Sequence, residues 1–404
     1  MKREHALQRV KNYIISTALG QKIFIRRPQR KFLEEYGDLP IKEKKIVFSN
    51  YMGKGFGDNP KYIAEALLKQ GYDKFDMVWL ISDDEPAKNF PEQIRLVNYN
   101  SKEALYEYAT AKLWICNYHL VKFFRRGLVK KAGQVFVQTW HGSLGIKKIE
   151  NDVDLLKQSK LWLILAEESS RETDYWISNS KFESEIYRNA FWGVDSILEY
   201  GHPRNDVFFR GSEAESHKVK EALGVSGDKK ILLYTPTFRE DYRVSCYDID
   251  YKAITENLRS RFGGEWICIV RMHPRMREVS GAIPPKSHNV YDLTFYDDAQ
   301  ELLSASDVLI SDYSSCMFDF MLSKRPVFIY ATDRREYAQE RGLYYPLEDT
   351  PFPIAESGKE LGENILNFNL DTYKADIAHF LTQKGCIEDG SASERTAAFI
   401  INLM

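Results

Sequence analysis

The sequence predicts an α/β fold divided into two domains, and three observations support this prediction. From about residue 45 onward, short apolar runs alternate with longer segments in which apolar residues recur at helical spacing. Such alternation is typical of parallel sheets flanked by helices. A charged, poorly apolar stretch at 211–220 interrupts the pattern, and 404 residues suffice for two separate cores. Because ligands of such sheets bind beyond the carboxyl ends of the strands, we expect a cleft between the two domains.

In the first half, apolar runs mark the strands and amphipathic segments mark the helices. The expected strands cover 45–48, 77–81, 113–117, 134–138 and 175–178, and the expected helices cover 60–68, 102–110 and 184–191. Asp58-Asn59-Pro60 begins the first of these helices, since this combination is a typical helix start. The half therefore resembles an open parallel sheet.

In the second half the same alternation resumes after the charged stretch. The expected strands cover 230–234, 266–270, 308–310 and 327–330, and the expected helices cover 253–262, 300–305, 359–366, 372–381 and 392–403. The unit 307–330 contains a strand, a turn at Ser311–Ser315, a helix and a second strand. The turn could present backbone N–H groups and serine hydroxyls to a phosphate, or it could simply cap a packed helix.

Composition indicates a globular protein in a reducing compartment. Hydrophobic residues make up 44% and charged residues 28%, and the net charge of −2 argues against general nucleic-acid binding. The five cysteines are scattered without metal-ligand spacing, which is typical of reduced thiols in a cytoplasmic protein. We find no apolar run near the roughly 20 residues that a spanning helix needs, and no signal-peptide core.

Segment 1–40 differs from the rest because it is strongly basic and amphipathic. Leu7, Val10, Ile14 and Ala18 recur at helical spacing between many lysines and arginines. Such a helix can lie on an anionic membrane surface, or it can pack on its own domain with a solvated basic face. A second basic cluster could form a further surface for lipid or an anionic acceptor, or it could be a solvated helix. It comprises Lys122, Arg125, Arg126, Lys130 and Lys131, with Phe123 and Phe124 between them.

Polar residues gather where four of the predicted strands end. In chain order these residues are His141 with Lys147 and Lys148, then Arg239, then Arg271 with His273 and Arg275, and then Asp312 with Ser314 and Ser315. Because the carboxyl ends of parallel strands face the cleft, these groups should surround a common ligand. Imidazole, guanidinium and hydroxyl groups favour negatively charged oxygen, and phosphate is the most plausible form of it.

Motifs for other phosphate chemistries are missing from the sequence. Neither the P-loop pattern nor the dinucleotide-binding glycine pattern occurs, and Gly53–Gly57 has the wrong spacing for either. Histidine and cysteine pairs with metal-ligand spacing are missing as well. We therefore expect no cofactor and no metal, so that side chains alone neutralise the phosphate charge.

Seven segments in this order resemble one known family, the CDP-glycerol glycerophosphotransferases, which include the primases and polymerases of teichoic acid and related capsules. The segments are 58–63, 138–143, 201–206, 234–239, 271–274, 311–320 and 341–345. The resemblance implies a GT-B architecture, in which two Rossmann-like domains face each other across a cleft. It implies an acceptor-side domain over 41–211 and a CDP-donor-binding domain over 212–404, with the last helix crossing back to the first domain.

This resemblance also implies an activity and a set of site residues. A hydroxyl of a lipid-linked saccharide or polymer acceptor would attack a CDP-polyol, most plausibly CDP-glycerol, and release CMP at the cytoplasmic face of the membrane. The implied catalytic residues are His141 as general base, His273 and Asp312. The implied substrate-binding residues are Arg239, Arg271, Thr235, Thr237, Ser314, Ser315, Lys147, Lys148, Arg204, Asn205 and Asn117.

Two departures from the family pattern stand out. Ser143-Leu144-Gly145-Ile146-Lys147 replaces a shorter Thr-Pro-Leu-Lys run after His141, so either Lys147 or Lys148 could take the position of the family lysine. His202 stands where a tyrosine is usual. Two other functions remain open from the residues alone, namely a GT-B glycosyltransferase that uses a nucleotide sugar and a non-catalytic binder of an anionic glycopolymer. The sequence also leaves open the polyol, the acceptor, and whether one unit is added or many.

Overall fold

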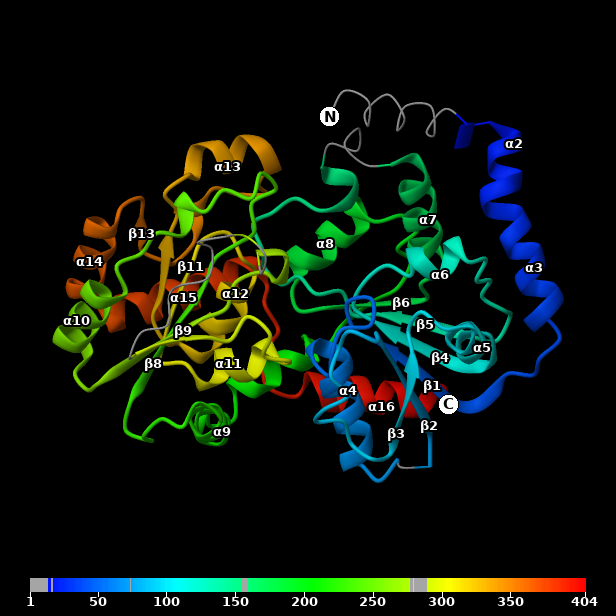
Figure 1. Cartoon of the computed structure of the whole chain (residues 1–404), viewed down its shortest axis with the longest axis horizontal. Coiled ribbons are helices and arrows are strands. Elements are labelled where there is room, and N and C mark those ends of the chain that lie inside the picture. Colours follow the sequence, from blue (N-terminus) through cyan, green and yellow to red (C-terminus); the bar gives the residue numbers. More distant parts are fainter. Residues whose placement is uncertain (1–13, 16, 73, 154–158, 277–278, 280–288) are drawn as a thin grey trace.

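The computed structural model describes residues 14–404, apart from 16, 73, 154–158, 277–278 and 280–288. Two α/β units lie side by side, and each is built on its own sheet (Figure 1). Every strand pair in both sheets is parallel, as the alternation of strands and helices predicts.

The first sheet has seven strands in the order β3-β2-β1-β4-β5-β6-β7. Its strands are β1 (Lys42–Ser49), β2 (Asp76–Ile81), β3 (Ile94–Asn98), β4 (Ala111–Cys116), β5 (Val135–Gln138), β6 (Tyr175–Ser178) and β7 (Ile197–Glu199). Its helices are α4 (Asp58–Lys69), α5 (Lys102–Thr110), α6 (Val121–Arg125), α7 (Lys160–Arg171) and α8 (Lys181–Ala190), and the 3₁₀ segment η4 (Pro203–Phe208) follows β7.

Side chains of β2 show how this sheet is buried on both faces. Val78 and Leu80 belong to one hydrophobic cluster, whereas Met77 and Trp79, which alternate with them along the strand, belong to another. Successive residues of a strand point to opposite faces, so the two clusters lie on the two sides of the sheet. A parallel sheet covered by helices on both faces therefore holds the first domain together.

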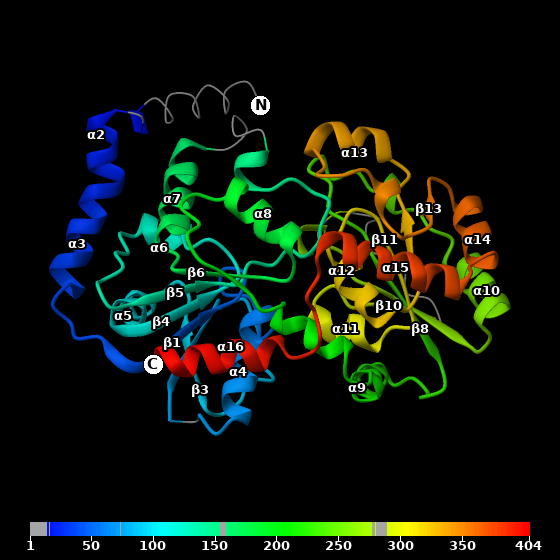
Figure 2. The same cartoon turned by 180° about the vertical axis from the view of Figure 1, so that it is seen from behind.

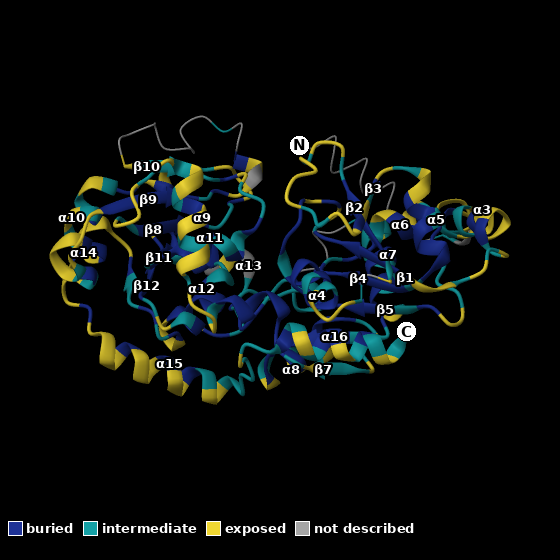
Figure 3. Cartoon of the chain, turned by 90° about the horizontal axis from the view of Figure 1, so that it is seen from below, coloured by how far each residue is buried: buried dark blue, intermediate teal, exposed yellow. Residues whose placement is uncertain are grey.

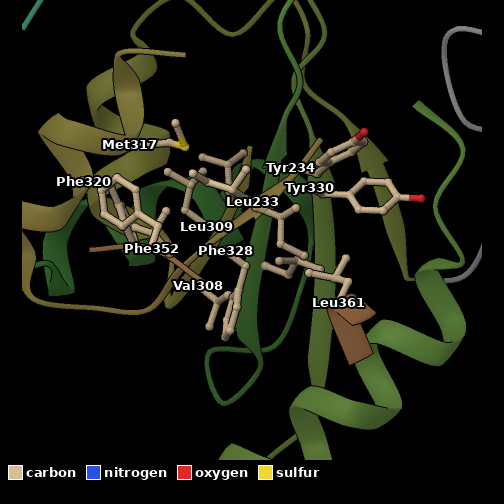
Figure 4. Close-up of a cluster of buried hydrophobic side chains, with 14 of the residues drawn as sticks. Leu233, Tyr234, Val308, Leu309, Met317, Phe320, Phe328, Tyr330, Phe352 and Leu361 are labelled. Atoms are coloured by element: carbon tan, nitrogen blue, oxygen red, sulfur yellow. The ribbon is translucent and has the colours of Figure 1, made fainter. Parts of the chain in front are cut away.

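The second sheet has six strands in the order β10-β9-β8-β11-β12-β13. Its strands are β8 (Lys230–Thr235), β9 (Trp266–Val270), β10 (Val290–Asp292), β11 (Val308–Ser311), β12 (Val327–Tyr330) and β13 (Ile354–Ala355). Its helices are α9 (Glu213–Leu223), α10 (Tyr251–Phe262), α11 (Ala299–Ala305), α12 (Cys316–Phe320), α13 (Arg334–Arg341), α14 (Gly358–Leu366) and α15 (Leu370–Lys384). Leu233, Leu309 and Phe328 are fully buried in its core (Figure 4).

The charged stretch 211–220, which interrupts the alternating pattern in the sequence, largely forms a helix. Helix α9 covers most of this stretch and packs against α11. Val219 supplies its single buried side chain among the described residues of α9, which explains why the apolar pattern was too weak to reveal a helix. Exposed residues alternate with partly buried ones along this helix (Figure 3).

The last helix, α16 (Ala392–Leu403), packs on the first domain although it follows the second domain in sequence. Ala397 and Ile400 share a hydrophobic cluster with Ile63 and Leu67 of α4. Seen from behind, α16 runs beside α4 beneath the first sheet (Figure 2). Asp206 of η4 caps it, because its carboxylate accepts from the backbone N–H of Ala392 at 2.9 Å.

The described part of the basic segment forms one helical run, α2 (Ala18–Gln21), the π-helical η1 (Lys22–Arg26) and α3 (Arg27–Tyr36). Phe32 and Tyr36 are buried against the first domain. Residues 1–13, which include the predicted apolar positions Leu7 and Val10, lie outside the described residues. Among the described helices, none is long and apolar enough to cross a membrane.

The second basic cluster does not expose its phenylalanines. Phe123 and Phe124 of α6 are buried in the core of the first domain. Lys130 pairs with Asp174 at 2.7 Å, and Lys131 donates to the carbonyl of Leu39 at 2.6 Å. Phe123 and Phe124 therefore belong to the core of the first domain, so the expectation that these two rings form part of a surface for lipid or an anionic acceptor is wrong.

Candidate active site

A cavity of about 950 Å³ opens beyond the carboxyl ends of β8, β9 and β11. Loops 235–241, 271–275 and 314–316 of the second domain line it, and Lys147 and Val153 of the first half complete the wall. Strand-end residues of the second domain, namely Arg239, Arg271, His273 and Ser314, therefore line one cavity, as expected for a parallel sheet, whereas His141 and Asp312 are not among its lining residues.

Arg271, directly after β9, lines this cavity with an incompletely bonded guanidinium. One of its terminal nitrogens donates to the carbonyl of Tyr296 at 3.4 Å. Its Nε is buried, and no hydrogen-bond partner for it exists among the described residues. Burial lowers the pKa of Arg271, although Asp298 acts in the opposite direction. A buried donor without an acceptor indicates that an anionic ligand completes its bonding.

His273 lies at the exposed edge of the same cavity, two residues after Arg271. Its ring lies 5.1 Å from the ring of Phe238, and its Nδ1 accepts from the backbone N–H of Arg275 at 3.2 Å. Partial removal from water, followed by the positive charges of Arg275, Lys147 and Arg271, lowers the pKa of His273 to about 4. The imidazole is therefore neutral at pH 7, and with Nδ1 accepting it carries its proton on Nε2.

Arg239 also lines this cavity, but it bonds mainly to Asp312 behind it and to other neighbouring protein groups. Arg239 pairs with Asp312 at 2.9 Å and with Asp333 at 2.6 Å. Burial alone would lower the pKa of Arg239, but the two carboxylates raise it. Asp312 also accepts from the backbone N–H of Thr237 at 2.8 Å. This buried trio braces the loop after β8.

The predicted hydroxyl groups surround the start of α12. Thr235 Oγ1 lies 3.3 Å from the Sγ of Cys316, and Ser314 Oγ accepts from the backbone N–H of Cys316 at 3.4 Å. Thr237 Oγ1 is buried without a hydrogen-bond partner within the described residues. Ser315 stands at the first position before α12 and faces Gly145 of the first half. Thr235, Thr237 and Ser314 line the cavity.

His141 lies on the first-domain side, after β5. Its Nδ1 is 2.7 Å from the carbonyl oxygen of Asn117, and its ring packs against Trp140 and Tyr51 at 4.3 and 5.0 Å. A carbonyl only accepts, so Nδ1 carries the proton and Nε2 keeps a free lone pair. Burial lowers the pKa of His141 to about 4, with Asp58 acting in the opposite direction. A neutral imidazole with an accepting Nε2 has the form of a general base.

Beneath His141 lies a carboxylate that sequence reasoning missed, Asp58. It adopts a positive φ of 54° at the start of α4, and its Oδ2 accepts from the hydroxyl of Tyr51 at 3.2 Å. Burial alone would raise the pKa of Asp58, but the Arg204 guanidinium holds it below its ordinary value. In the sequence, Asp58-Asn59-Pro60 was a helix start and part of the family resemblance, but neither signal indicated that Asp58 pairs with Arg204.

Arg204 joins the two domains below the cleft. Its guanidinium pairs with Asp58 of the first domain at 3.2 Å and with Asp319 of α12 at 3.1 Å, and it donates to the carbonyl of Gly142 at 2.7 Å. Next to it, Asn205 donates to Glu388 at 2.8 Å and accepts from Gln300. Both predicted substrate-binding residues are buried within protein contacts.

Asn117, Lys147 and Lys148 fall into three different settings. Asn117 is fully buried, accepts from the backbone N–H of Tyr51 at 2.9 Å and donates to Asn50 at 2.8 Å. Lys147 lines the large cavity, whereas Lys148 lines a separate pocket of about 360 Å³ beside α8. Geometry therefore separates the two lysines that the sequence could not distinguish.

Metal ligands do not cluster here. Across the described residues, no three histidine, cysteine or carboxylate side chains lie close enough together to hold a metal ion. The positive groups at the cavity are the arginine and lysine side chains named above.

Comparison with known proteins identifies the family. The model for "CDP-Glycerol:Poly(glycerophosphate) glycerophosphotransferase" matches residues 35–402. The chain belongs to this family. The family predicted from sequence is therefore confirmed, and with it the class of enzyme.

Individual relatives agree with this assignment. A teichoic acid poly(glycerol phosphate) polymerase of Bacillus spizizenii is 33% identical over 89% of this chain and 92% of its own length. The teichoic acid glycerol-phosphate transferase of Staphylococcus aureus is 30% identical over 87% of this chain and 91% of its own length. The chain spans only half of a Staphylococcus epidermidis polymerase to which it is 33% identical.

Among solved structures, a histidine variant of the wall teichoic acid polymerase TagF soaked with CDPG superposes with a TM-score of 0.79. It is 30% identical, and the match covers 100% of this chain and 98% of that chain. Two facing Rossmann-like sheets and this match confirm the predicted GT-B architecture.

Proposed function

We propose that this protein transfers a polyol phosphate, glycerol phosphate above all, from a CDP-polyol to a hydroxyl of a lipid-linked or polymer acceptor, with release of CMP. The buried, incompletely bonded guanidinium of Arg271 in a cavity shared with His273 and Lys147 carries this proposal, because it needs an anionic oxygen. Membership of the family supplies the identity of that anion as a CDP-linked diphosphate.

His141 acts as the general base in this mechanism. Its Nε2 takes the proton from the acceptor hydroxyl, whose oxygen forms a bond to the β-phosphorus of the donor. The bond from that phosphorus to the bridging oxygen breaks, and CMP leaves with the electron pair. An anionic donor opposite His141 stabilises the imidazolium, so it raises the pKa of His141 from its low value in the free protein.

Arg271, His273 and Lys147 stabilise charge on the donor phosphates as CMP leaves. Donors held in place before the reaction supply this stabilisation without reorganising. We assign a different role to Arg239 and Asp312, which hold each other and the loop after β8 in position. Arg204, Asn205 and Asn117 likewise support the site through protein contacts.

Glycerol phosphate is favoured over ribitol phosphate by the relatives. The glycerol-phosphate polymerases reach 33% identity, whereas a poly(ribitol-phosphate) polymerase of Bacillus spizizenii is 27% identical. The direct test incubates the protein with CDP-glycerol, CDP-ribitol and a panel of nucleotide sugars, together with a lipid-linked acceptor analogue. We expect CMP release and a product heavier by glycerol phosphate. Release of nucleotide from a sugar donor alone would identify a glycosyltransferase, and binding without release of any nucleotide would identify a non-catalytic binder.

We also propose peripheral contact with an anionic membrane at its cytoplasmic face, through α2 and η1. Leu19, Ile23 and Phe24 are 66%, 44% and 42% exposed, and Lys22 and Arg26 stand among them. Exposed apolar side chains beside lysine and arginine suit the interface of an anionic bilayer.

Vesicle sedimentation tests this contact. Phosphatidylglycerol vesicles should bind the parent protein, and the double variant Ile23→Asp/Phe24→Asp should lose most of this binding. Leu366→Asp is the matched control, because Leu366 is equally exposed, at 46%, on α14 of the second domain. An equal loss of vesicle binding in the double variant and in the control, or vesicle binding that neither changes, would contradict the proposed membrane contact.

A further inference from the structure

The segment that follows His141 leaves the first domain and enters the core of the second. His141 is held by the Asn117 carbonyl of the first domain. Leu144 and Ile146, only a few residues later, are fully buried in the hydrophobic cluster of the second domain. Residues 142–146 therefore connect the general base to the opposite side of the cleft.

Beyond Ile146 the segment pairs with a strand-like stretch of the second domain, and we name these paired stretches, 146–149 and 342–344, the clasp. The backbone N–H of Tyr344 donates to the carbonyl of Ile146 at 2.7 Å, and that of Lys148 donates to the carbonyl of Gly342 at 3.2 Å. Lys147 and Leu343 form an antiparallel bridge between them.

Tyr344 closes the clasp with its side chain as well. Its hydroxyl donates to the Oδ2 of Asp152 at 2.6 Å and accepts from the backbone N–H of Ile149 at 3.3 Å. Gly342 permits the close approach, because it adopts a φ of +76° and a Cβ there would lie 3.2 Å from Cδ of Lys148. The hydroxyl of Tyr344 thus holds both ends of the short loop 149–152 of the first half.

The clasp determines which lysine reaches the donor cavity. Successive side chains of an extended segment point to opposite sides. Lys147 accordingly lines the large cavity with Arg271 and His273, while Lys148 lines the smaller pocket together with Tyr344 and Asp152. A shift of the segment by one residue would exchange the two lysines.

We propose that Tyr344 is a positioning residue that holds Lys147 in register over the donor diphosphate. Tyr344 lines the smaller pocket, so it acts on the donor through Lys147. This inference rests on the proposed function, since Lys147 needs the donor diphosphate as its target.

Hydrogen exchange tests the clasp without any turnover. In Tyr344→Phe the ring is kept but the bonds to Asp152 and Ile149 are lost. We expect the amides of peptides covering 144–149 to exchange about 10-fold faster, whereas peptides from α4 and β11 keep their parent rates. Unchanged exchange over 144–149 would show that Tyr344 does not hold this segment.

Kinetics with CDP-glycerol test the consequence for Lys147. Tyr344→Phe should lower kcat/KM for the donor about 10-fold or more and leave KM for the acceptor unchanged, because small misplacements of binding groups are costly. Asp152→Ala should reproduce this loss. Asp152→Asn, whose amide oxygen can still accept from Tyr344, should restore most of the parent rate.

A double-mutant cycle separates positioning from general loosening of the domains. In a Lys147→Ala background, Tyr344→Phe should lower kcat/KM for CDP-glycerol little further. Tyr62→Phe is the matched control, since it removes another phenol bond between the domains, to Asp298 at 3.0 Å, away from the clasp. The factor by which Tyr62→Phe changes kcat/KM should multiply with the factor for Lys147→Ala.

Independent, multiplicative effects of Tyr344→Phe and Lys147→Ala would overturn the inference. If the parent protein releases no CMP from CDP-glycerol, the proposed function fails instead, and the hydrogen-exchange result still decides whether the clasp exists.

Discussion

Two arginines, Arg204 and Arg271, received the same interpretation from sequence as substrate-binding residues, and the structure separates them. Arg204 is paired with Asp58 and Asp319, and burial, which would lower its pKa, is outweighed by these carboxylates, so its pKa is raised. Arg271 has one long bond to a carbonyl and a buried Nε without a partner in the described chain, and its pKa is lowered. The guanidinium of Arg204 is fully paired without a ligand, whereas the hydrogen bonding of Arg271 is incomplete. Arg204 is therefore scaffold, and Arg271 is the better candidate for contact with phosphate.

Arg204→Leu should give the largest effect. It leaves two carboxylates buried without their cation, which costs about 3–5 kcal/mol of folding free energy. Urea denaturation, followed by circular dichroism, measures the loss. Arg204→Leu/Asp319→Leu should recover part of the stability, because one of the two unpaired charges is removed with the arginine. A single variant as stable as the parent would show that Arg204 is no scaffold.

His141→Ala should abolish most turnover and spare donor binding. Loss of a general base lowers kcat by roughly 10²- to 10⁴-fold. CMP release at saturating CDP-glycerol measures kcat, and calorimetric titration of CDP-glycerol measures the donor affinity. His217→Ala on the exposed face of α9 is the control for loss of a histidine. Parent-like kcat in the His141 variant would remove His141 from the mechanism.

Arg271→Leu should show the opposite profile from Arg204→Leu. Stability should stay within about 1 kcal/mol of the parent, because an incompletely bonded, desolvated cation is replaced by an apolar side chain. Loss of a preorganised donor to the phosphate should cost about 2–4 kcal/mol of transition-state stabilisation. Denaturation and kcat/KM for CDP-glycerol provide the two readouts. Strong destabilisation with normal kcat/KM would reverse the two arginine roles.

Sequence reasoning could find the strand ends but not the pairing state of their side chains. The alternation of apolar runs placed His141, Arg239, Arg271 and Asp312 at the ends of parallel strands, and topology alone then brings Arg239 and Arg271 to one cavity. Whether an arginine there is already paired depends on partners distant in sequence. Asp319 lies 115 residues from Arg204 and Asp333 lies 94 residues from Arg239.

Segments that belong to one domain in sequence and to the other in space were equally hidden. Leu144 and Ile146 look like ordinary loop residues after His141, yet they are buried in the core of the second domain. Short strands such as β7 and β13 escaped as well, since two or three residues show no periodicity. Their places are determined by neighbouring strands, which single-sequence patterns do not contain.

The pH dependence of stability should give the smallest effect, and it tests the surroundings of His141 on the first-domain side of the cleft. Burial lowers the pKa of His141 to about 4, below the unperturbed value of about 6.5. Between these two values the unfolded chain binds the proton that the folded chain excludes, so stability is retained above pH 6.5 and falls as the pH decreases toward 4.

Acidification from pH 7 to pH 5 should therefore cost the parent roughly 2 kcal/mol more than it costs His141→Gln. Urea denaturation of both proteins at the two pH values measures this difference. His217→Gln, on the exposed face of α9, is the control for the loss of a histidine. CDP-glycerol should reduce the difference, because an anion next to the ring favours the imidazolium in the folded state. If the parent and His141→Gln lose equal stability, the surroundings of His141 do not lower its pKa in the folded protein.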